Sequence, residues 1–216
     1  MFRVVHRQWV YISLSAWLIA CAAVLGILIS YANAGGDQGG LPAGWTPAPE
    51  LDAPDDRAML IVFAHPKCPC TRATMSAIER LQRDVPGTFA TRVVFYEPAD
   101  ADGSWRETDL WARAGKLVDA KAIADPQGLL TANAGAVVSG CVVLFDVHGV
   151  LRFWGGLTPS RGHEGESLGM STIRSILNGD ETKHARASVF GCDIIGSDDH
   201  SIGLCGGGGC DAGNHD

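Results

Sequence analysis

Charged residues are absent from positions 9–31, and basic residues are in the minority over the whole chain. The 216 residues include 17 Lys and Arg against 24 Asp and Glu, which gives a net charge of −7. This balance argues against nucleic-acid binding, which requires a basic face. The sequence also lacks a glycine motif followed by Lys and Ser or Thr that would cradle a phosphate, so it implies no organic cofactor. Internal repeats are lacking too, and the length suits one domain with appendages.

The charge-free stretch is long enough to span a bilayer as a helix, which takes ~20 apolar residues. Arg3 and Arg7 precede it and acidic residues follow it, so the positive-inside rule places the N-terminus in the cytoplasm. We predict that residues 1–34 form a single-pass anchor and that the rest is extracytoplasmic, in the periplasm. Two alternatives remain open, a signal cleaved at the A-x-A-like residues 32–34 and a lipoprotein acylated at Cys21. All three place the folded domain outside the cytoplasm.

Three further regions follow the N-terminal segment. Residues 35–56 are rich in Gly and Pro and are predicted to be a flexible linker. Residues 57–179 are predicted to be the folded domain, and residues 180–216 a flexible tail rich in Cys and Gly. The tail cysteines are Cys192, Cys205 and Cys210. Their spacing matches no standard zinc module, so we expect a disordered tail with one disulfide. Loose metal binding and electron exchange between a tail thiol and Cys68 remain open alternatives.

Hydrophobic periodicity predicts strands and helices in alternation within the domain. The predicted strands span residues 59–64, 90–96, 122–125, 141–146 and 150–154, and the predicted helices span residues 71–85, 104–117, 127–134 and 168–177. Ser104 and Glu107 have the spacing of a capping box that would open the second helix. Strand–helix alternation followed by a hairpin and a helix indicates an α/β fold with a mixed sheet flanked by helices.

Two thiols, Cys68 and Cys70, lie between the first predicted strand and its helix. The unpaired N–H groups and the positive dipole at a helix N-terminus both favour a thiolate, so they lower the pKa of a cysteine there. Lys67 adds positive charge. The pattern indicates a redox pair in which Cys68 attacks a disulfide and Cys70 resolves the mixed disulfide. A metal site and a static structural pair remain open.

The order of these elements resembles a thioredoxin-like domain over about residues 57–179. Residues 61–70 match the turn that carries the first thioredoxin cysteine, and residues 124–150 are similar to the second half of the membrane-tethered TlpA and ResA type. Residues 65–72 and 160–165 resemble the pattern of the RedB-like bacterial group. The resemblance implies a thiol–disulfide oxidoreductase that acts on protein thiols or disulfides, or on a membrane redox partner.

The chain departs from the family pattern at two places. The family turn is Cys-x-x-Cys, whereas here it is Cys68-Pro-Cys70, and a disulfide in so small a ring is more strained and easier to reduce. The position of the family's cis-proline falls on Gly140, which puts substrate handling in doubt and leaves a non-catalytic binding module open. Cys141 follows Gly140 and is interpreted either as a small buried apolar residue or as a third thiol near Cys68 and Cys70. With His65, three thiolates would suit Cu(I) or Zn, so a metal-binding or delivery protein is the alternative function.

Two histidines complete the candidate site. His65 stands at the end of the first strand, where it can relay protons. His163 lies in a loop and is either a surface residue or, through the RedB-like pattern, a group that lines the site. The predicted site residues are therefore Cys68 and Cys70 as catalytic thiols, with His65, Lys67, Gly140, Cys141 and His163 as lining residues.

Overall fold

The computed structural model describes residues 2–36, 39–42, 45–51, 56–180, 182 and 186–194, with side chains from His6 onward. The predictions for Cys205, Cys210 and the rest of residues 195–216 lie outside the described residues.

A five-stranded mixed sheet stands at the centre, in the order β3-β2-β1-β4-β5. The strands are β1 (Ala58–Ala64), β2 (Phe89–Glu97), β3 (Ala120–Pro126), β4 (Cys141–Phe145) and β5 (Leu151–Gly155). The first three run parallel, while β4 is antiparallel to β1 and β5 is antiparallel to β4. All residues of β1 are buried, as its uninterrupted apolar run predicts for a central strand.

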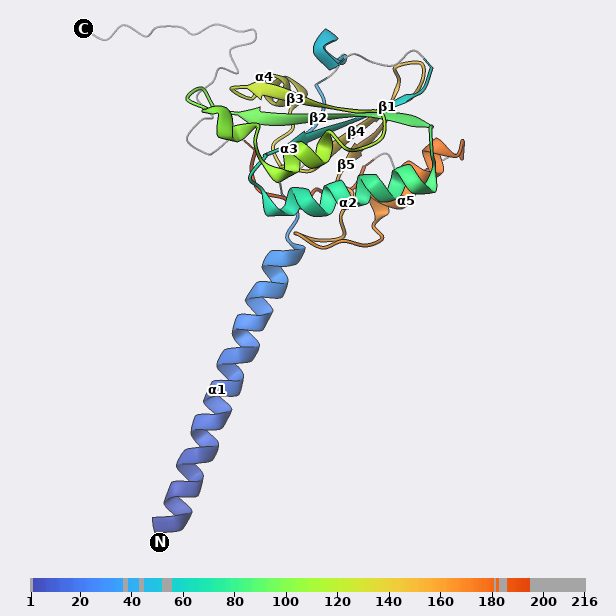
Figure 1. Ribbon diagram of the computed structural model, residues 1–216. Coiled ribbons are helices and arrows are strands. Elements are labelled where there is room, and N and C mark those ends of the chain that lie inside the picture. The colour runs from blue at the N-terminus through green and yellow to red at the C-terminus, as the bar shows by residue number, and fades with distance from the viewer. Residues whose placement is uncertain are drawn as a thin grey trace, which may run out of the picture.

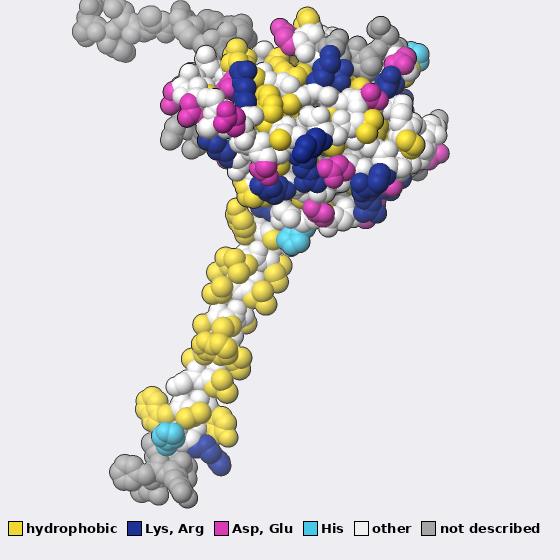
Figure 2. Space-filling view, in the orientation of Figure 1, with side chains coloured by type: hydrophobic (Ala, Val, Ile, Leu, Met, Phe, Trp, Pro, Cys, Tyr) yellow, Lys and Arg dark blue, Asp and Glu magenta, His cyan; other side chains and the backbone are white. Residues whose placement is uncertain are grey.

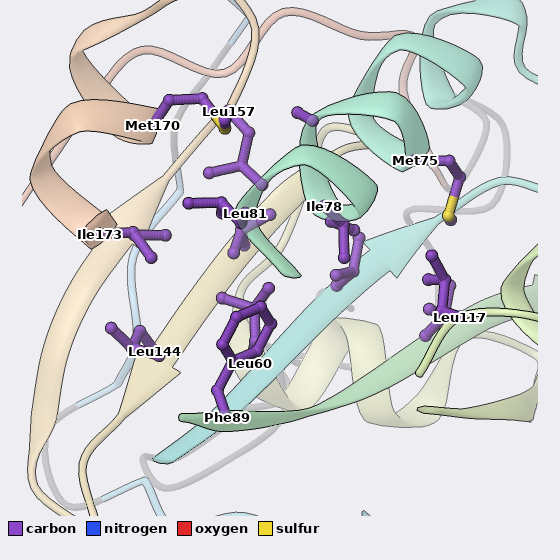
Figure 3. Packing of buried hydrophobic residues seen from close by; sticks show 14 of the residues in the cluster. Leu60, Met75, Ile78, Leu81, Phe89, Leu117, Leu144, Leu157, Met170 and Ile173 are labelled. Carbon is purple, nitrogen blue, oxygen red and sulfur yellow. The ribbon is translucent and has the colours of Figure 1, made fainter. Parts of the chain in front are cut away.

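Helices cover both faces of the sheet (Figure 1). They are α2 (Pro69–Asp84), α3 (Asp109–Ala114), α4 (Leu129–Ala134) and α5 (Leu168–Leu177), with 3-10 turns at Pro49–Leu51 and Gly103–Trp105. On the face covered by α2, α3 and α5, the helical spacing of Met75, Ile78 and Leu81 brings all three into the core cluster that also contains Leu60 (Figure 3). The mixed sheet flanked by helices confirms the predicted fold class.

The predicted capping box at Ser104 and Glu107 was wrong. Ser104 lies inside the short 3-10 turn, where its hydroxyl and its backbone N–H bond the side chain of Asp102. The helix α3 begins later, and the hydroxyl of Thr108 accepts a hydrogen bond from the backbone N–H of Trp111. The Ser104 hydroxyl therefore bonds Asp102, which caps the 3-10 turn, and it does not cap α3.

The second face of the sheet is covered by α4 and by segments from outside residues 57–179. Leu51 is fully buried, and its carbonyl accepts a hydrogen bond from Arg92 Nε at 2.6 Å. Trp45 stacks on Phe145 with 5.7 Å between ring centroids. These described parts of residues 35–56 pack on the domain, which differs from the flexible linker expected from their composition.

Residues 186–194, hereafter the C-terminal segment, also pack on the sheet. The segment runs along the edge strand β5, where the N–H of Ala187 donates to the carbonyl of Trp154 at 3.3 Å. A Cβ on Gly155 would lie 2.4 Å from the Ala187 oxygen, so only glycine permits this approach. Val189 and Ile194 are buried at 1% exposure each. These nine residues belong to the packed domain, which differs from the predicted flexible tail.

The helix α1 (Phe2–Asn33) projects from the domain as a single rod (Figure 1). Within it, His6–Asn33 is long and apolar enough to cross a membrane, and none of it is buried against the domain. Hydrophobic side chains cover much of the visible side of the rod, which also shows basic and histidine side chains near its far end, and most of the charged side chains lie on the domain (Figure 2). This is the composition of a membrane anchor or a signal sequence.

Candidate functional site

Cys68 lies where β1 passes into α2. It is the N-cap residue of α2, with extended backbone angles, and Pro69 follows as the first helical residue. Proline suits this position because it has the φ of a helix and its missing N–H would have no partner there. The Cys68 side chain is 3% exposed. The apolar strand and the proline thus fix a thiol at the start of the helix.

Three thiols converge at this point. The sulfurs of Cys68, Cys70 and Cys192 all lie within 4.8 Å of one another. The pair Cys68 and Cys192 is in hydrogen-bond contact, with 3.0 Å between the sulfurs. The structure therefore brings the two predicted thiols together and adds a third from the C-terminal segment.

The backbone around Cys192 holds its thiol in place. The carbonyl of Cys192 accepts a hydrogen bond from the N–H of Ser139 at 2.8 Å, and the N–H of Ile194 donates to the carbonyl of Val137 at 2.9 Å. Arg161 donates to the carbonyl of Gly191. A Cβ on Gly191 would lie 1.9 Å from the Ser139 oxygen. Only glycine at this position therefore lets the C-terminal segment lie so close to the backbone that precedes β4.

The environment lowers the pKa of the Cys68 thiol. Burial raises the pKa, but hydrogen bonds from the Cys192 thiol and from the backbone N–H groups of Cys192, Thr71 and Cys70 outweigh it. Two of these N–H groups belong to the first turn of α2, as expected for a thiol at a helix N-terminus. The stabilising contacts are thus the helix amides and Cys192, whereas the charge of Lys67 acts on His65 and Asp102.

The pKa values of the Cys70 and Cys192 thiols shift in the opposite direction, upward. Burial, followed by the hydrogen bond and negative charge of Cys68, raises the pKa of Cys192 to about 12. Burial and the charge of Cys68 also raise the pKa of Cys70, and the positive charge of Arg161 opposes this rise. As the pH rises, Cys68 is therefore the first of the three thiols to lose its proton, and Cys70 and Cys192 keep theirs to higher pH.

His65 and Lys67 lie beside the turn within an aromatic cluster. The His65 ring stacks on Tyr96 at 6.0 Å and meets Trp105 edge-on at 5.4 Å, while the Lys67 ammonium lies 4.0 Å from the Trp105 ring centre. Burial and the charge of Lys67 lower the pKa of His65. Its Nδ1 accepts the N–H of Lys67, so the neutral ring carries its proton on Nε2.

Gly140 faces the first turns of α2. Its N–H donates to the carbonyl of Phe63 at 2.8 Å, and its φ is +91°. A Cβ here would lie 2.8 Å from the Oγ1 of Thr74 on α2. The chain therefore passes α2 at a distance that favours glycine, in a conformation that side chains rarely adopt.

Cys141 is separated from the three thiols by the sheet. It pairs with Phe63 in the register of β4 and β1, and both side chains belong to the core on the face opposite α2. Its side chain is 1% exposed, and burial raises the pKa of its thiol. The structure supports its interpretation as a buried apolar residue, and Cys192 takes the place in the cluster that the sequence analysis offered to Cys141.

His163 is exposed and lies in a tight turn. Its Nδ1 is 2.8 Å from the carbonyl oxygen of Arg161, and its N–H donates to Ser160. The same loop contributes Arg161, whose guanidinium reaches the C-terminal segment. Arg161 is therefore the residue that connects this loop to the thiols.

A groove of about 260 Å³ lies beside the cysteine turn. It lies between this turn and the start of α3, and Lys67, Arg72 and Asp109 supply its charged groups. Cys68, which is nearly buried, is one of the residues that line the groove.

Ser139 is the residue that the sequence analysis missed entirely. It is fully buried, and its hydroxyl accepts the N–H of His65 at 2.9 Å and bonds Thr71 Oγ1 at 2.8 Å. Its own N–H holds Cys192. A lone serine before a strand gives no signal in the sequence, because its partners lie 68 and 74 positions away.

Comparison with known proteins identifies the fold. No protein-family model matches the chain, and no curated protein matches it. Among solved structures, an uncharacterised conserved protein from Geobacillus kaustophilus is 20% identical, with 64% of this chain and 77% of that chain covered and a TM-score of 0.51. A hypothetical protein from Sinorhizobium meliloti 1021 is 19% identical, with 76% and 97% covered and a TM-score of 0.52.

A thioredoxin-like protein solved in its oxidised form is 15% identical, with 67% of this chain and 98% of that chain covered and a TM-score of 0.44. Likeness at such identities concerns the fold and not the activity. Three parallel strands, an antiparallel pair and helices on both faces form the arrangement predicted from the sequence. This mixed α/β arrangement is the one expected for a thioredoxin-like domain, and the chain shares its fold with the two uncharacterised proteins above.

Proposed function

We propose that this protein is a membrane-anchored, extracytoplasmic thiol–disulfide oxidoreductase of the TlpA and ResA type, nearest to the RedB-like group. The observation that carries the proposal is the Cys68 thiol, which lies at the N-terminus of α2 beside a groove, with two further thiols within 4.8 Å. A thiolate with a lowered pKa and a second thiol in reach are the two parts that disulfide exchange requires.

The reaction uses these parts in two steps. The Cys68 thiolate attacks one sulfur of a substrate disulfide, forming a mixed disulfide, and the other substrate sulfur leaves as a thiolate that takes up a proton. A second protein thiol then loses its proton and attacks the Cys68 sulfur, which releases the remaining substrate thiol. The substrate gains two electrons, and two protein thiols become a disulfide.

The proposed partners are protein thiols or disulfides outside the cytoplasm, or a membrane redox protein. The apolar helix α1 supports attachment to the membrane, and the basic residues before it support a cytoplasmic N-terminus. A membrane-impermeant maleimide applied to intact cells tests this topology. Labelling of the domain thiols in intact cells is expected, and labelling only after lysis would contradict it.

The decisive experiment is a redox titration of the full-length protein in detergent, with its metal content measured on the same sample. The protein is equilibrated in glutathione buffers of graded potential, alkylated, and weighed by mass spectrometry. A reversible two-electron midpoint in metal-free protein is expected, and it should be lost in Cys68→Ser. Absence of any reversible disulfide would refute the proposal, and a non-catalytic module would give this result without bound metal.

The second candidate function is metal binding or delivery. It is favoured by the three sulfurs within 4.8 Å, a set of soft ligands that suits Cu(I). Structural zinc normally takes four ligands, so three thiols favour Cu(I) over zinc. Titration with Cu(I) against a chromophoric chelator should then give one ion per chain. Binding should be lost in Cys192→Ser and retained in Cys141→Ala, and equal binding by these two variants would exclude the site.

A further inference from the structure

The two possible partners of Cys68 differ in how they face it. Cys68 is the N-cap residue of α2 and Cys70 is the second residue of the helix, and their sulfurs lie within 4.8 Å of each other. A disulfide between residues only two positions apart closes a small ring, which departs from the usual disulfide geometry and is strained. A Cys68–Cys70 bond is therefore within reach but strained.

Cys192 approaches Cys68 from outside the helix. Its sulfur is already 3.0 Å from the Cys68 sulfur, in contact across a sequence separation of 124 positions. Forming a bond of ~2.05 Å between them takes a shift of about 1 Å. The side chain of Cys192 is on an exposed residue with no helix to distort, so it can make this shift by rotation.

The backbone of the C-terminal segment makes this contact specific. Hydrogen bonds from Ser139 and from the Arg161 side chain hold the carbonyls of Cys192 and Gly191, one on each side of the thiol-bearing Cα. Ile194, two residues on, is buried and bonded to Val137. A thiol that only drifted past the site on a loose tail would need none of these contacts.

We propose that Cys192, and not Cys70, is the thiol that resolves Cys68. This inference rests on the proposed oxidoreductase function and assigns its second thiol. After Cys68 has formed a mixed disulfide with the substrate, the Cys192 sulfur gives up its proton and attacks the Cys68 sulfur. The Cys68–substrate bond breaks, the substrate thiolate takes a proton, and the protein holds a Cys68–Cys192 disulfide. A reductant of the thiol class then returns both sulfurs to thiols.

The bond can be located directly by peptide mapping. Full-length protein in detergent is oxidised with glutathione disulfide, blocked with N-ethylmaleimide, and digested with trypsin and a protease that cuts before aspartate. The sequence then yields a peptide of residues 68–72 and a peptide of residues 187–192, free of the later cysteines. The expected product joins these two peptides. An internal bond within residues 68–72 would overturn the proposal.

Kinetics of three variants give an independent readout. Glutathione disulfide is added, and the adduct on Cys68 is followed by intact mass. Cys70→Ser should resolve the adduct at nearly the rate of the unaltered protein, as should Cys21→Ser, a control on α1. Cys192→Ser should accumulate the adduct, with resolution slowed on the order of 100-fold or more, because no equally positioned thiol replaces it. Rapid resolution in Cys192→Ser, or slow resolution in Cys70→Ser, would overturn the proposal.

Failure of the underlying function gives a different result. If no adduct forms on Cys68 in any variant, the oxidoreductase function itself is refuted, and this inference with it. If adducts form and resolve through Cys70, the function stands and only the assignment of Cys192 falls. Unchanged circular dichroism of Cys192→Ser shows that the variant is folded, as expected because backbone contacts hold the C-terminal segment.

Discussion

Ser139 is a buried hydroxyl that holds three parts of the site together: the His65 turn, the first turn of α2 and the C-terminal segment. In Ser139→Ala the part-buried N–H of His65 and the buried hydroxyl of Thr71 both lose a partner, which costs about 1–3 kcal/mol. Urea unfolding should show this loss, whereas Ser171→Ala on the exposed face of α5 should change stability little. Equal stability of the two variants would mean that the hydroxyl does not organise the site.

The Cys68 thiolate should be visible in a pH titration. Thiolate forms as the pH rises, so a lowered pKa moves the rise in ultraviolet thiolate absorbance of Cys68 to a pH below that of an ordinary cysteine. Cys68→Ser should remove this earliest rise. Cys192→Ala should move it to higher pH, because alanine has no group that can donate a hydrogen bond to the Cys68 thiolate. A titration unaffected by Cys192→Ala would show that the two thiols are not in contact in solution.

Whether a residue of the site could be predicted depends on how far along the sequence its partners lie. Cys68 and Cys70 could be predicted because local features suffice, namely an apolar strand, a turn and a helix start. Cys192 and Ser139 could not, because their roles depend on contacts across more than half of the domain. The Cys141 alternative failed for the same reason, since the side of the sheet on which a strand residue lies depends on register.

At the scale of elements, β4 and α2 approach each other closely at Gly140. Gly140→Ala should destabilise the domain through its φ of +91° and through the 2.8 Å contact of the new Cβ with Thr74 Oγ1. Gly149→Ala is the matched control, since Gly149 also has a positive φ, of +72°, but has open space around it. The control should lose roughly 1–2 kcal/mol from backbone strain, and Gly140→Ala should lose more.

A double-mutant cycle separates the two causes. If the contact with Thr74 adds to the cost, Thr74→Ala should be less harmful in the Gly140→Ala background than in the unaltered protein. Additive effects, or equal losses for the two glycine variants, would show that β4 can move away from α2 at no cost.

Regular elements were predictable and irregular ones were not. The bounds of α5 agree with the predicted residues 168–177, and each of the five predicted strands is present within two residues at either end. Periodicity reports on side chains that face a core. Besides their apolar side chains, the segments 39–42 and 186–194 place glycines against neighbouring backbone, as at Gly39, whose Cβ would lie 2.0 Å from the oxygen of Gly135. Such contacts leave no pattern in the sequence.

At the scale of the molecule, the two ends of the domain meet beside the thiols. The N–H of Arg161 donates to the carbonyl of Ala32 near the end of α1, and its guanidinium lies 5.1 Å from the Tyr31 ring centre and also reaches Gly191. Gly36 bonds Val189 in the same region. Arg161 therefore contacts both the end of α1 and the C-terminal segment that carries Cys192.

The gain in stability on oxidation of the thiols therefore depends on which disulfide forms. A Cys68–Cys192 disulfide closes a loop of 124 positions, and the chain-entropy model assigns about 4–5 kcal/mol to a loop of this length. A Cys68–Cys70 bond closes so small a loop that the same model gives about 1–2 kcal/mol. For a domain of this size the larger value corresponds to a rise in Tm of roughly 10 °C or more.

Thermal melts of oxidised and reduced full-length protein in the same detergent measure the difference. The rise in Tm on oxidation should persist in Cys70→Ser and in Cys21→Ser, and it should vanish in Cys192→Ser. If the rise instead persists in Cys192→Ser and vanishes in Cys70→Ser, the redox-active disulfide joins Cys68 and Cys70. A stabilisation that depends on Cys192 would mean that each redox cycle forms and breaks a covalent bond between the C-terminal segment and the start of α2.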